Sequence, residues 1–222
     1  MKYLSEDFFA FFKELEFNNH KDWFDINRKR YEESVKKPFE NFVAAILSKI
    51  QKNDDRIQIS ASKAIFRINK DVRFSKDKSP YKTNRSALIS PFGTKDKVFP
   101  GLYFEINTSK ISIYAGAYSL DSAQIQRVRE EIVDYYQGFI SIIENKEFKK
   151  TFGAIRGERN TRVSQEFKSY VETIPYVLNK NFYVMAQYPV EILNKIDAVD
   201  FITHHYQLAK PFNGFLERPI LS

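Results

Sequence analysis

The sequence predicts an α+β protein with a central antiparallel sheet of about four meander strands, flanked by N-terminal and C-terminal helices. Two observations support this fold class. Hydrophobic residues follow helical spacing over residues 1–52, alternate with polar residues over 57–118, and return mostly to helical spacing over 121–222. In addition, neither an internal repeat nor a low-complexity linker interrupts the chain, so we expect one domain spanning 1–222.

The N-terminal segment carries two hydrophobic stripes at helical spacing. Ser5, followed by two acidic residues, is suited to cap the first helix, and Pro38 is suited to the first turn of the second. The first stripe consists of Phe8, Phe11, Phe12 and Leu15, and the second of Phe39, Phe42, Val43, Ile46, Leu47 and Ile50. Between them, Trp23 and Phe24 stand at a helix start, where we expect them to anchor the core.

The middle segment contains short β-rich runs with a period of two. These runs are RIQISASKAIFRI, RSALISPF, GLYFEINTS and KISIYAGAYS. The NTSK segment at 107–110 suits a hairpin turn. Because the links between successive runs are short, we expect an antiparallel sheet and not a Rossmann arrangement.

The C-terminal segment returns to helices. Asp121 and Gln124 have the spacing of an N-cap and its reciprocal partner. The core face of the following helix would consist of Ile125, Val128, Ile132, Tyr136, Phe139 and Ile143. Residues 147–187 show no clear period beyond a short helix and a loop, and Pro189 is expected to open a last helical region.

The excess positive charge of the chain is local. Between Lys63 and Lys97 stand ten cations and three acids, so this window carries the whole net charge of +7. Cations and acids balance elsewhere. A localised excess of this kind indicates a basic surface that attracts an anionic partner.

A single stretch, FRINKDVRFSKDKSPYKTN at 66–84, holds most of this charge. As a strand, 66–74 would direct Phe66, Ile68, Val72 and Phe74 to the core and Arg67, Asn69, Asp71 and Arg73 to the other face. Both guanidiniums would then lie on one face, with Asp71 between them to orient both, and guanidinium donors suit a phosphate or carboxylate. Lys70 interrupts the apolar face and predicts a bulge.

We therefore expect an anion-binding site in this stretch. Its candidate ligand-binding residues are Arg67, Asp71, Arg73, Asp77, Lys78, Tyr81 and Lys82. Tyr81 would offer a ring for stacking and a hydroxyl donor. Polar residues of the neighbouring strands, Glu105, Tyr114 and Tyr118, contribute only if their faces lie on the same side of the sheet, which the sequence leaves open.

The segment RINKDVRFSKDKSPYKT resembles the signature of a mainly bacterial family catalogued as a domain of unknown function, number 2461. The matching positions are Arg67, Lys70, Asp71, Arg73, Phe74, Asp77, Lys78 and Tyr81, with Lys70 in place of the usual arginine. NNHKDWFDINRKRYE also resembles the N-terminal pattern of the family, and GERNTRV, NKNFYV and LAKPFNGFL resemble later segments. The resemblance thus covers nearly the whole chain, but it implies neither an activity nor catalytic residues.

Three functional hypotheses remain open. The first is a module that binds a phosphate-bearing ligand, a nucleic acid included, at the basic stretch. The second is an enzyme acting on a phosphorylated or carboxylated small molecule, with Asp71 or Glu105 as base and Tyr81 as acid. The third is structural, a salt-bridge network that sets strand register.

Composition excludes several chemistries. Without cysteine, the chain has no disulfide, thiolate ligand or thiol nucleophile. His204 and His205 point about 100° apart on a helix, and His205 falls on a hydrophobic stripe, so we expect no metal site. Seven glycines and no phosphate-binding glycine loop predict no cofactor. No signal peptide and no membrane helix is indicated, so we expect a cytoplasmic protein without a membrane partner; the oligomeric state is left open.

Overall fold

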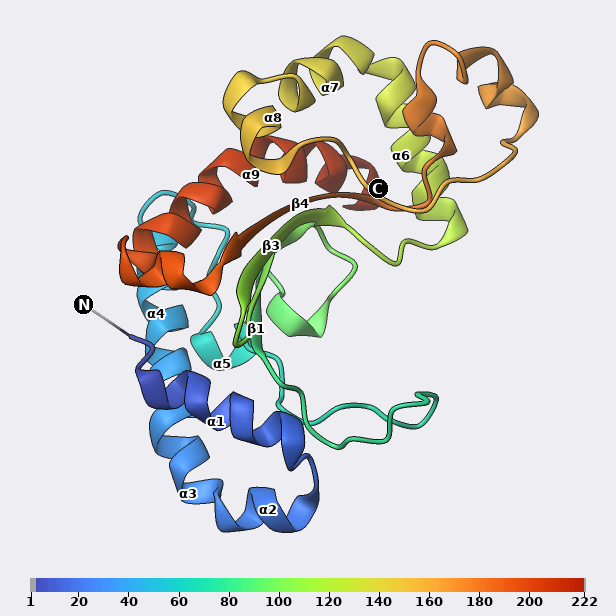
Figure 1. Cartoon of the computed structure of the whole chain (residues 1–222). Coiled ribbons are helices and arrows are strands. Elements are labelled where there is room, and N and C mark those ends of the chain that lie inside the picture. The colour runs from blue at the N-terminus through green and yellow to red at the C-terminus, as the bar shows by residue number, and fades with distance from the viewer. Residues whose placement is uncertain (1–2, 222) are drawn as a thin grey trace. The chain divides into compact units, whose positions relative to one another are not determined.

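A four-stranded antiparallel sheet with flanking helices forms the α+β fold of residues 3–221, which the computed structural model describes (Figure 1). The strands are β1 (Arg85–Ile89), β2 (Gly101–Ile106), β3 (Lys110–Ala117) and β4 (Phe182–Pro189), hydrogen-bonded in the order β1-β2-β3-β4. The predicted fold class is therefore confirmed. The predicted turn at 107–110 joins β2 to β3, where the side chain of Asn107 accepts hydrogen bonds from the backbone of Ser109 and Lys110.

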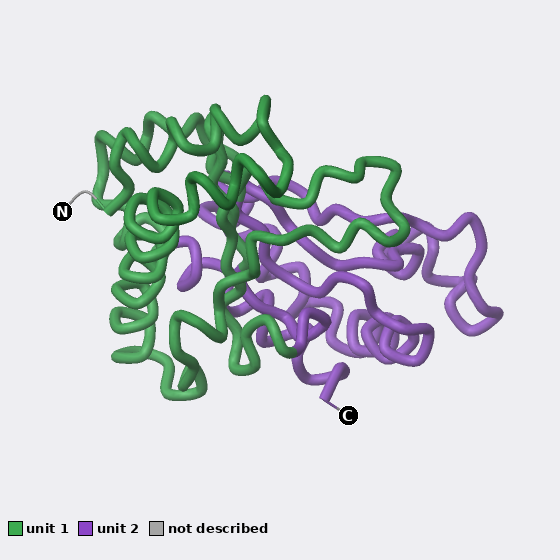
Figure 2. Tube along the Cα trace, turned by 90° about the horizontal axis from the view of Figure 1, so that it is seen from below, with its two compact units in different colours: residues 1–95, 103–112, 187–204 green, residues 96–102, 113–186, 205–222 purple. Residues whose placement is uncertain are grey.

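The chain divides into two compact units (Figure 2). The first comprises residues 1–95, 103–112 and 187–204, and the second comprises 96–102, 113–186 and 205–222. The expectation of a single domain over 1–222 stays a prediction.

Helices dominate the first half of the first unit. They are α1 (Glu6–Phe17), α2 (Lys21–Ile26), α3 (Arg28–Arg30), the π-helical segment η1 (Tyr31–Lys36) and α4 (Lys37–Gln51). Ser5 caps α1 by accepting a hydrogen bond from the Phe8 amide, and Pro38 lies in the first turn of α4, both as predicted. Every member of the two predicted hydrophobic stripes is buried, so this unit has an aromatic-rich core.

The first predicted strand is wrong. In place of a strand over 56–68, the chain forms the short helix α5 (Ala61–Ala64), because Ala and Lys favour a helix and the alternating run before it is too short to pair along its length. Residues 66–74 are not a strand either; isolated antiparallel bridges join Ile65 to Ala87 and Asn69 to Tyr81. Phe74, expected in the core, is 96% exposed.

The second unit contains helices between β3 and β4. These are α6 (Ser122–Asp134), α7 (Tyr136–Ile143) and α8 (Lys146–Phe152), followed by the 3-10 turns η3 (Gln165–Tyr170) and η4 (Pro175–Leu178). Asp121 and Gln124 form the predicted capping box. The predicted continuous helix is interrupted at Tyr135, whose ψ of 37° ends α6.

The strand β4 was not predicted, because residues 147–187 showed no clear period. Its pairing depends on Gly116 of β3, which has a φ of +114° and approaches the β4 backbone so closely that a Cβ would stand 2.2 Å from the Phe182 carbonyl oxygen. Only glycine tolerates both conditions.

A 3-10 turn, η5 (Val190–Asn194), follows β4, and the long helix α9 (Ala198–Leu221) ends the described chain. His205 is buried against the Phe152 ring, as its position on a hydrophobic stripe predicts. Across residues 3–221, no helix has both the length and the hydrophobicity needed to cross a membrane.

Candidate anion-binding pocket

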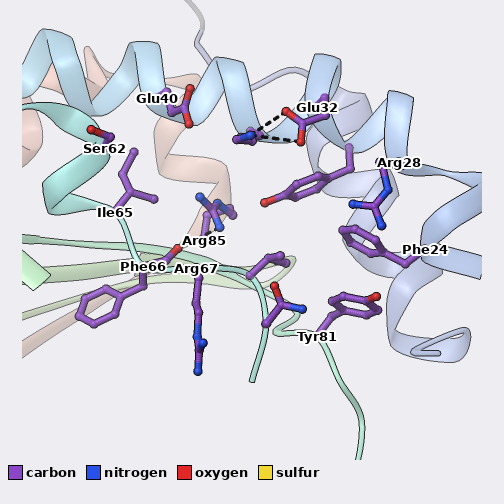
Figure 3. Close-up of a pocket in the computed structure, with 14 residues that line it drawn as sticks. Phe24, Arg28, Glu32, Glu40, Ser62, Ile65, Phe66, Arg67, Tyr81 and Arg85 are labelled. Carbon is purple, nitrogen blue, oxygen red and sulfur yellow. Dashed lines mark hydrogen bonds and ion pairs between the residues drawn. The ribbon is translucent and has the colours of Figure 1, made fainter. Parts of the chain in front are cut away.

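The first unit contains a pocket of about 380 Å³ (Figure 3). One wall comes from the helical segment that runs from α2 through η1 into α4, and the opposite wall comes from residues 62–69, Tyr81 and Arg85. The volume lies within the range of pockets that hold small molecules, roughly 300–1,000 Å³. The wall includes a π-helical turn, a rare element that is frequent at functional sites.

Arg85 is the central charged group of the pocket. It is 4% exposed, and its guanidinium lies 5.4 Å from the centroid of the Phe39 ring. The hydrogen bond that it makes, from Nη1 at 3.1 Å, goes to the backbone carbonyl of Phe66 and not to a carboxylate. Its Nε is buried and has no hydrogen-bond partner among the described residues. Within residues 3–221, Arg85 is therefore a buried cation without a direct counter-ion.

The electrostatic cost of this arrangement is visible in the pKa of Arg85. Burial lowers this pKa, while Tyr31, Glu40 and Glu32 act in the opposite direction. Arginine nonetheless keeps its proton in proteins. An ionised group removed from water costs several kcal/mol unless a partner compensates it, so an anion entering the pocket would restore much of that loss.

Two buried tyrosines, Tyr31 and Tyr81, line the same pocket as this cation. Burial raises the pKa of Tyr31, and the positive charge of Arg85 opposes the shift. Tyr81 stacks on Phe24 with ring centroids 4.0 Å apart and an angle of 16° between the planes. Asn19 holds Tyr81 in place, because its side chain donates to the Tyr81 carbonyl and accepts from the Tyr81 amide. One face of the predicted stacking ring is thus already occupied within the protein.

A row of charged residues runs along the helical wall at intervals of four. Its members are Arg28, Glu32, Lys36 and Glu40. Lys36 Nζ lies 2.9 Å from Glu32, which raises the pKa of the lysine. Arg28 pairs with Asp25 outside the pocket. This row was not predicted from the sequence, although charged residues spaced by four on a helix are a readable signal.

Arg67 is the member of the predicted arginine pair that reaches this pocket. It lines the rim and is exposed, and Figure 3 shows its side chain extending away from Arg85. Arg73 does not line the pocket. The pocket lining therefore has more cations than carboxylates. The cations are Arg28, Lys36, Arg67 and Arg85, and the carboxylates are Glu32 and Glu40.

Four of the predicted binding residues, Asp71, Arg73, Asp77 and Lys78, lie on the arm, which comprises residues 70–79. Figure 1 shows the arm as a long teal loop that extends away from the helices of the first unit. Asp71 accepts hydrogen bonds from Arg73 Nε at 3.0 Å and Nη2 at 2.7 Å, which lowers the Asp71 pKa. Arg67 acts on Asp71 only through its charge, so the prediction that Asp71 orients both arginines holds for Arg73 alone.

A second set of contacts links the two sides of the arm. Asp77 accepts from Lys70 Nζ at 2.8 Å and from the Ser79 amide at 2.8 Å, and the Lys70 contact is the largest cause of its lowered pKa. Lys78 donates to the Val72 carbonyl at 3.0 Å. At the base of the arm, Lys82 Nζ lies 5.2 Å from the Phe66 ring. The contacts of Asp77 and Lys78 give the arm a defined conformation.

The candidate bases lie outside the pocket lining. Glu105 on β2 accepts from the Tyr103 hydroxyl at 2.9 Å and from Asn84 at 3.4 Å. Tyr114 and Tyr118 belong to the second unit, where both rings contact Tyr183. Of the sequence-predicted site residues, Arg67 and Tyr81 are therefore those that line the pocket. Within residues 3–221, no group of three His, Cys, Asp or Glu residues is arranged to hold a metal ion.

Fold and site together define an α+β protein with a concave site centred on a buried arginine. The chain belongs to the family described as "Conserved hypothetical protein (DUF2461)", whose model matches residues 7–215. This match confirms the resemblance of the RINKDVRFSKDKSPYKT segment, and it includes every residue that lines the pocket. No curated protein and no solved structure matches the chain. Function therefore has to be inferred from the site itself.

Proposed function

We propose that the protein binds a small molecule bearing a phosphate or carboxylate group in the pocket, with Arg85 as the anchor. The observation that supports this proposal is the buried guanidinium with an unpartnered Nε. Burying such a group costs free energy of folding, so its presence in a pocket indicates a functional role. Planar guanidinium donors match the oxygens of phosphate and carboxylate.

The surrounding residues assign roles to the rest of the ligand. The ring pair of Phe24 and Tyr81 forms an apolar wall, and the Tyr31 hydroxyl is a donor close to the cation. Arg67 at the rim would attract the anion during entry. The binding site thus shifts from the arm, where the charge excess of the sequence suggested it, towards the pocket at the base of the arm.

Binding of a polyanion by the arm is a second candidate, favoured by one specific observation. Phe74 stands almost fully exposed with the Arg73 guanidinium 5.9 Å from its ring, and Lys76 and Lys78 are exposed nearby. Single-stranded nucleic acid uses such aromatic and cationic groups. A Phe74→Ala variant should then weaken oligonucleotide binding, measured by fluorescence anisotropy across salt concentrations, and unchanged binding would remove this candidate.

The enzyme hypothesis stays a prediction, but the residues that could take part in catalysis differ from those expected from the sequence. Its candidate bases Asp71 and Glu105 do not line the pocket, whereas Tyr81 does. Catalysis in this pocket would depend on the tyrosines and on Glu40. The structural hypothesis concerns the arm, whose exposed ion pairs are each worth about 0–1 kcal/mol. A cytoplasmic location is likewise a prediction.

Thermal shift with inorganic phosphate, pyrophosphate, citrate and nucleoside monophosphates tests the main proposal. A ligand at ten times its Kd should raise the Tm by roughly 3–6 °C for a chain of this size. An Arg85→Gln variant should lose the shift, whereas an Arg73→Gln variant, which changes an exposed arginine outside the pocket, should retain it. Equal shifts in both variants would show that the anions bind elsewhere.

A further inference from the structure

The pocket also presents a carboxylate that has no direct partner in the part of the chain that the structure describes. Glu40, in the first turn of α4, lines the pocket and is half-buried. Within the described chain no donor forms a hydrogen bond or ion pair with it, whereas Glu32, the other lining carboxylate, is held by Lys36. Figure 3 shows Glu40 on the helical wall, across from Ser62 and Ile65.

We propose that the ligand is zwitterionic, with its anionic group at Arg85 and an ammonium group at Glu40. This inference rests on the proposed function, because it specifies the ligand of the same pocket. The chemical class is a small molecule in which an ammonium group lies a few bonds from a carboxylate or a phosphate.

Electrostatics connects the two groups. Glu40 is close enough to favour the charged form of Arg85, although the two side chains form no direct ion pair. The negative charge of Glu40 would repel a simple anion bound at Arg85. A ligand that carries its own ammonium group would convert that repulsion into an attraction, so the pocket would select zwitterions over plain anions.

The choice of ammonium follows from the donors already present in the pocket. Lys36, which lines the same wall, forms its ion pair with Glu32, although the charge of Glu40 also acts on it. Glu40 can therefore accept a hydrogen bond from a ligand, and a charged donor forms a shorter and stronger hydrogen bond with a carboxylate than a neutral one does. Replacing that ligand ammonium by a methyl group would leave Glu40 as an unpaired charge beside the bound anion.

Isothermal titration calorimetry with two matched ligand pairs tests this inference. O-phosphoethanolamine is compared with ethyl phosphate, and β-alanine is compared with propionate, so that each pair differs in the amine. The amine-bearing member should bind about fivefold tighter to the wild type, which corresponds to the upper end for a partly exposed ion pair. The pair that binds more tightly identifies the anionic group.

The variant Glu40→Gln should abolish the preference for the amine-bearing ligand by changing both affinities. It should weaken the amine-bearing ligand and strengthen its amine-free counterpart, because the repulsion disappears together with the attraction. Glu33→Gln is the matched control, since Glu33 lies in the same helical segment, is exposed and does not line the pocket. It should leave the preference unchanged.

The outcomes separate this inference from the proposed function. Equal affinities within both pairs would overturn the proposal that the ligand is zwitterionic. A preference for the amine that survives Glu40→Gln would overturn it as well. Binding of inorganic phosphate without binding of any of the four compounds also overturns it, and leaves the anion pocket in place. If no anion binds at all, the proposed function falls as well.

Discussion

Replacing Arg85 with methionine separates a ligand-binding arginine from a structural one. Methionine is unbranched and flexible, so it fills most of the space beneath the pocket. Exchanging buried ionic groups for apolar residues of similar volume is often neutral or stabilising, by up to about 4 kcal/mol. Against this gain stand the hydrogen bond to the Phe66 carbonyl, worth about 1 kcal/mol, and the contact with the Phe39 ring, worth about 1 kcal/mol.

Without ligand, the free energy of unfolding of Arg85→Met should therefore equal that of the wild type or exceed it by up to about 2 kcal/mol. Urea denaturation followed by circular dichroism measures the difference, provided that the m-values agree. The control is Arg30→Met, which removes an arginine bonded to Asp7 and Glu14 and should lower stability by about 1 kcal/mol. A loss of about 3–5 kcal/mol for Arg85→Met would show that Arg85 is structural, because that is the cost of breaking a buried charge network that the fold needs.

Three further predictions concern residues around the pocket and the sheet. Asn19→Ala should cost about 1–2 kcal/mol and speed hydrogen exchange at the Tyr81 amide, because both hydrogen bonds to Tyr81 disappear; Asn18→Ala, which removes one exposed hydrogen bond, should leave that amide unchanged. Gly116→Ala should lower the free energy of unfolding by more than about 2 kcal/mol in chemical denaturation, because the backbone is left-handed and the new Cβ collides with the Phe182 carbonyl; a neutral result would contradict the close approach of β3 and β4. Burial raises the Tyr31 pKa from 10.0, so the folded state holds this proton more tightly than the unfolded state does. The contribution of Tyr31 to the free energy of unfolding is fully present below pH 10.0 and decreases as the pH rises above it. Tyr31→Phe should therefore reduce the loss of stability at alkaline pH, as measured by denaturation curves.

Most of the longer helices and three of the four strands could be predicted because their signals are local. The stripes of α1 and α4, the cap at Ser5 and the capping box at Asp121 each depend on residues a few positions apart. The strand β4 could not be predicted in the same way. Its partner β3 ends at Ala117, and the close approach at Gly116 joins residues far apart in the sequence. The false strand near Ala61 shows the opposite error, since short alternating runs also occur before helices.

The candidate site was predictable in part. The charge excess and the signature segment led to Arg67 and Tyr81, which line the pocket. Arg85 stood within the same basic window, but its importance comes from burial beneath Phe39 and from the Phe66 carbonyl, which are tertiary contacts. Glu40 likewise had no local signal except its place in a row spaced by four. The sequence thus indicates which surface is charged, whereas the tertiary contacts show which charged side chains of the described residues lack a direct partner.

The most direct test of the anion pocket follows the Arg85 side chain by NMR during a titration with inorganic phosphate. The Nε–H signal of Arg85, assigned by its loss in Arg85→Lys, reports on a buried donor that has no partner within the described chain. We expect a saturable shift of this signal at phosphate concentrations that leave the Arg73 signal nearly unchanged. An unchanged Arg85 signal, or one that moves in parallel with that of the exposed Arg73 without saturating, would contradict the claim that this pocket binds an anion.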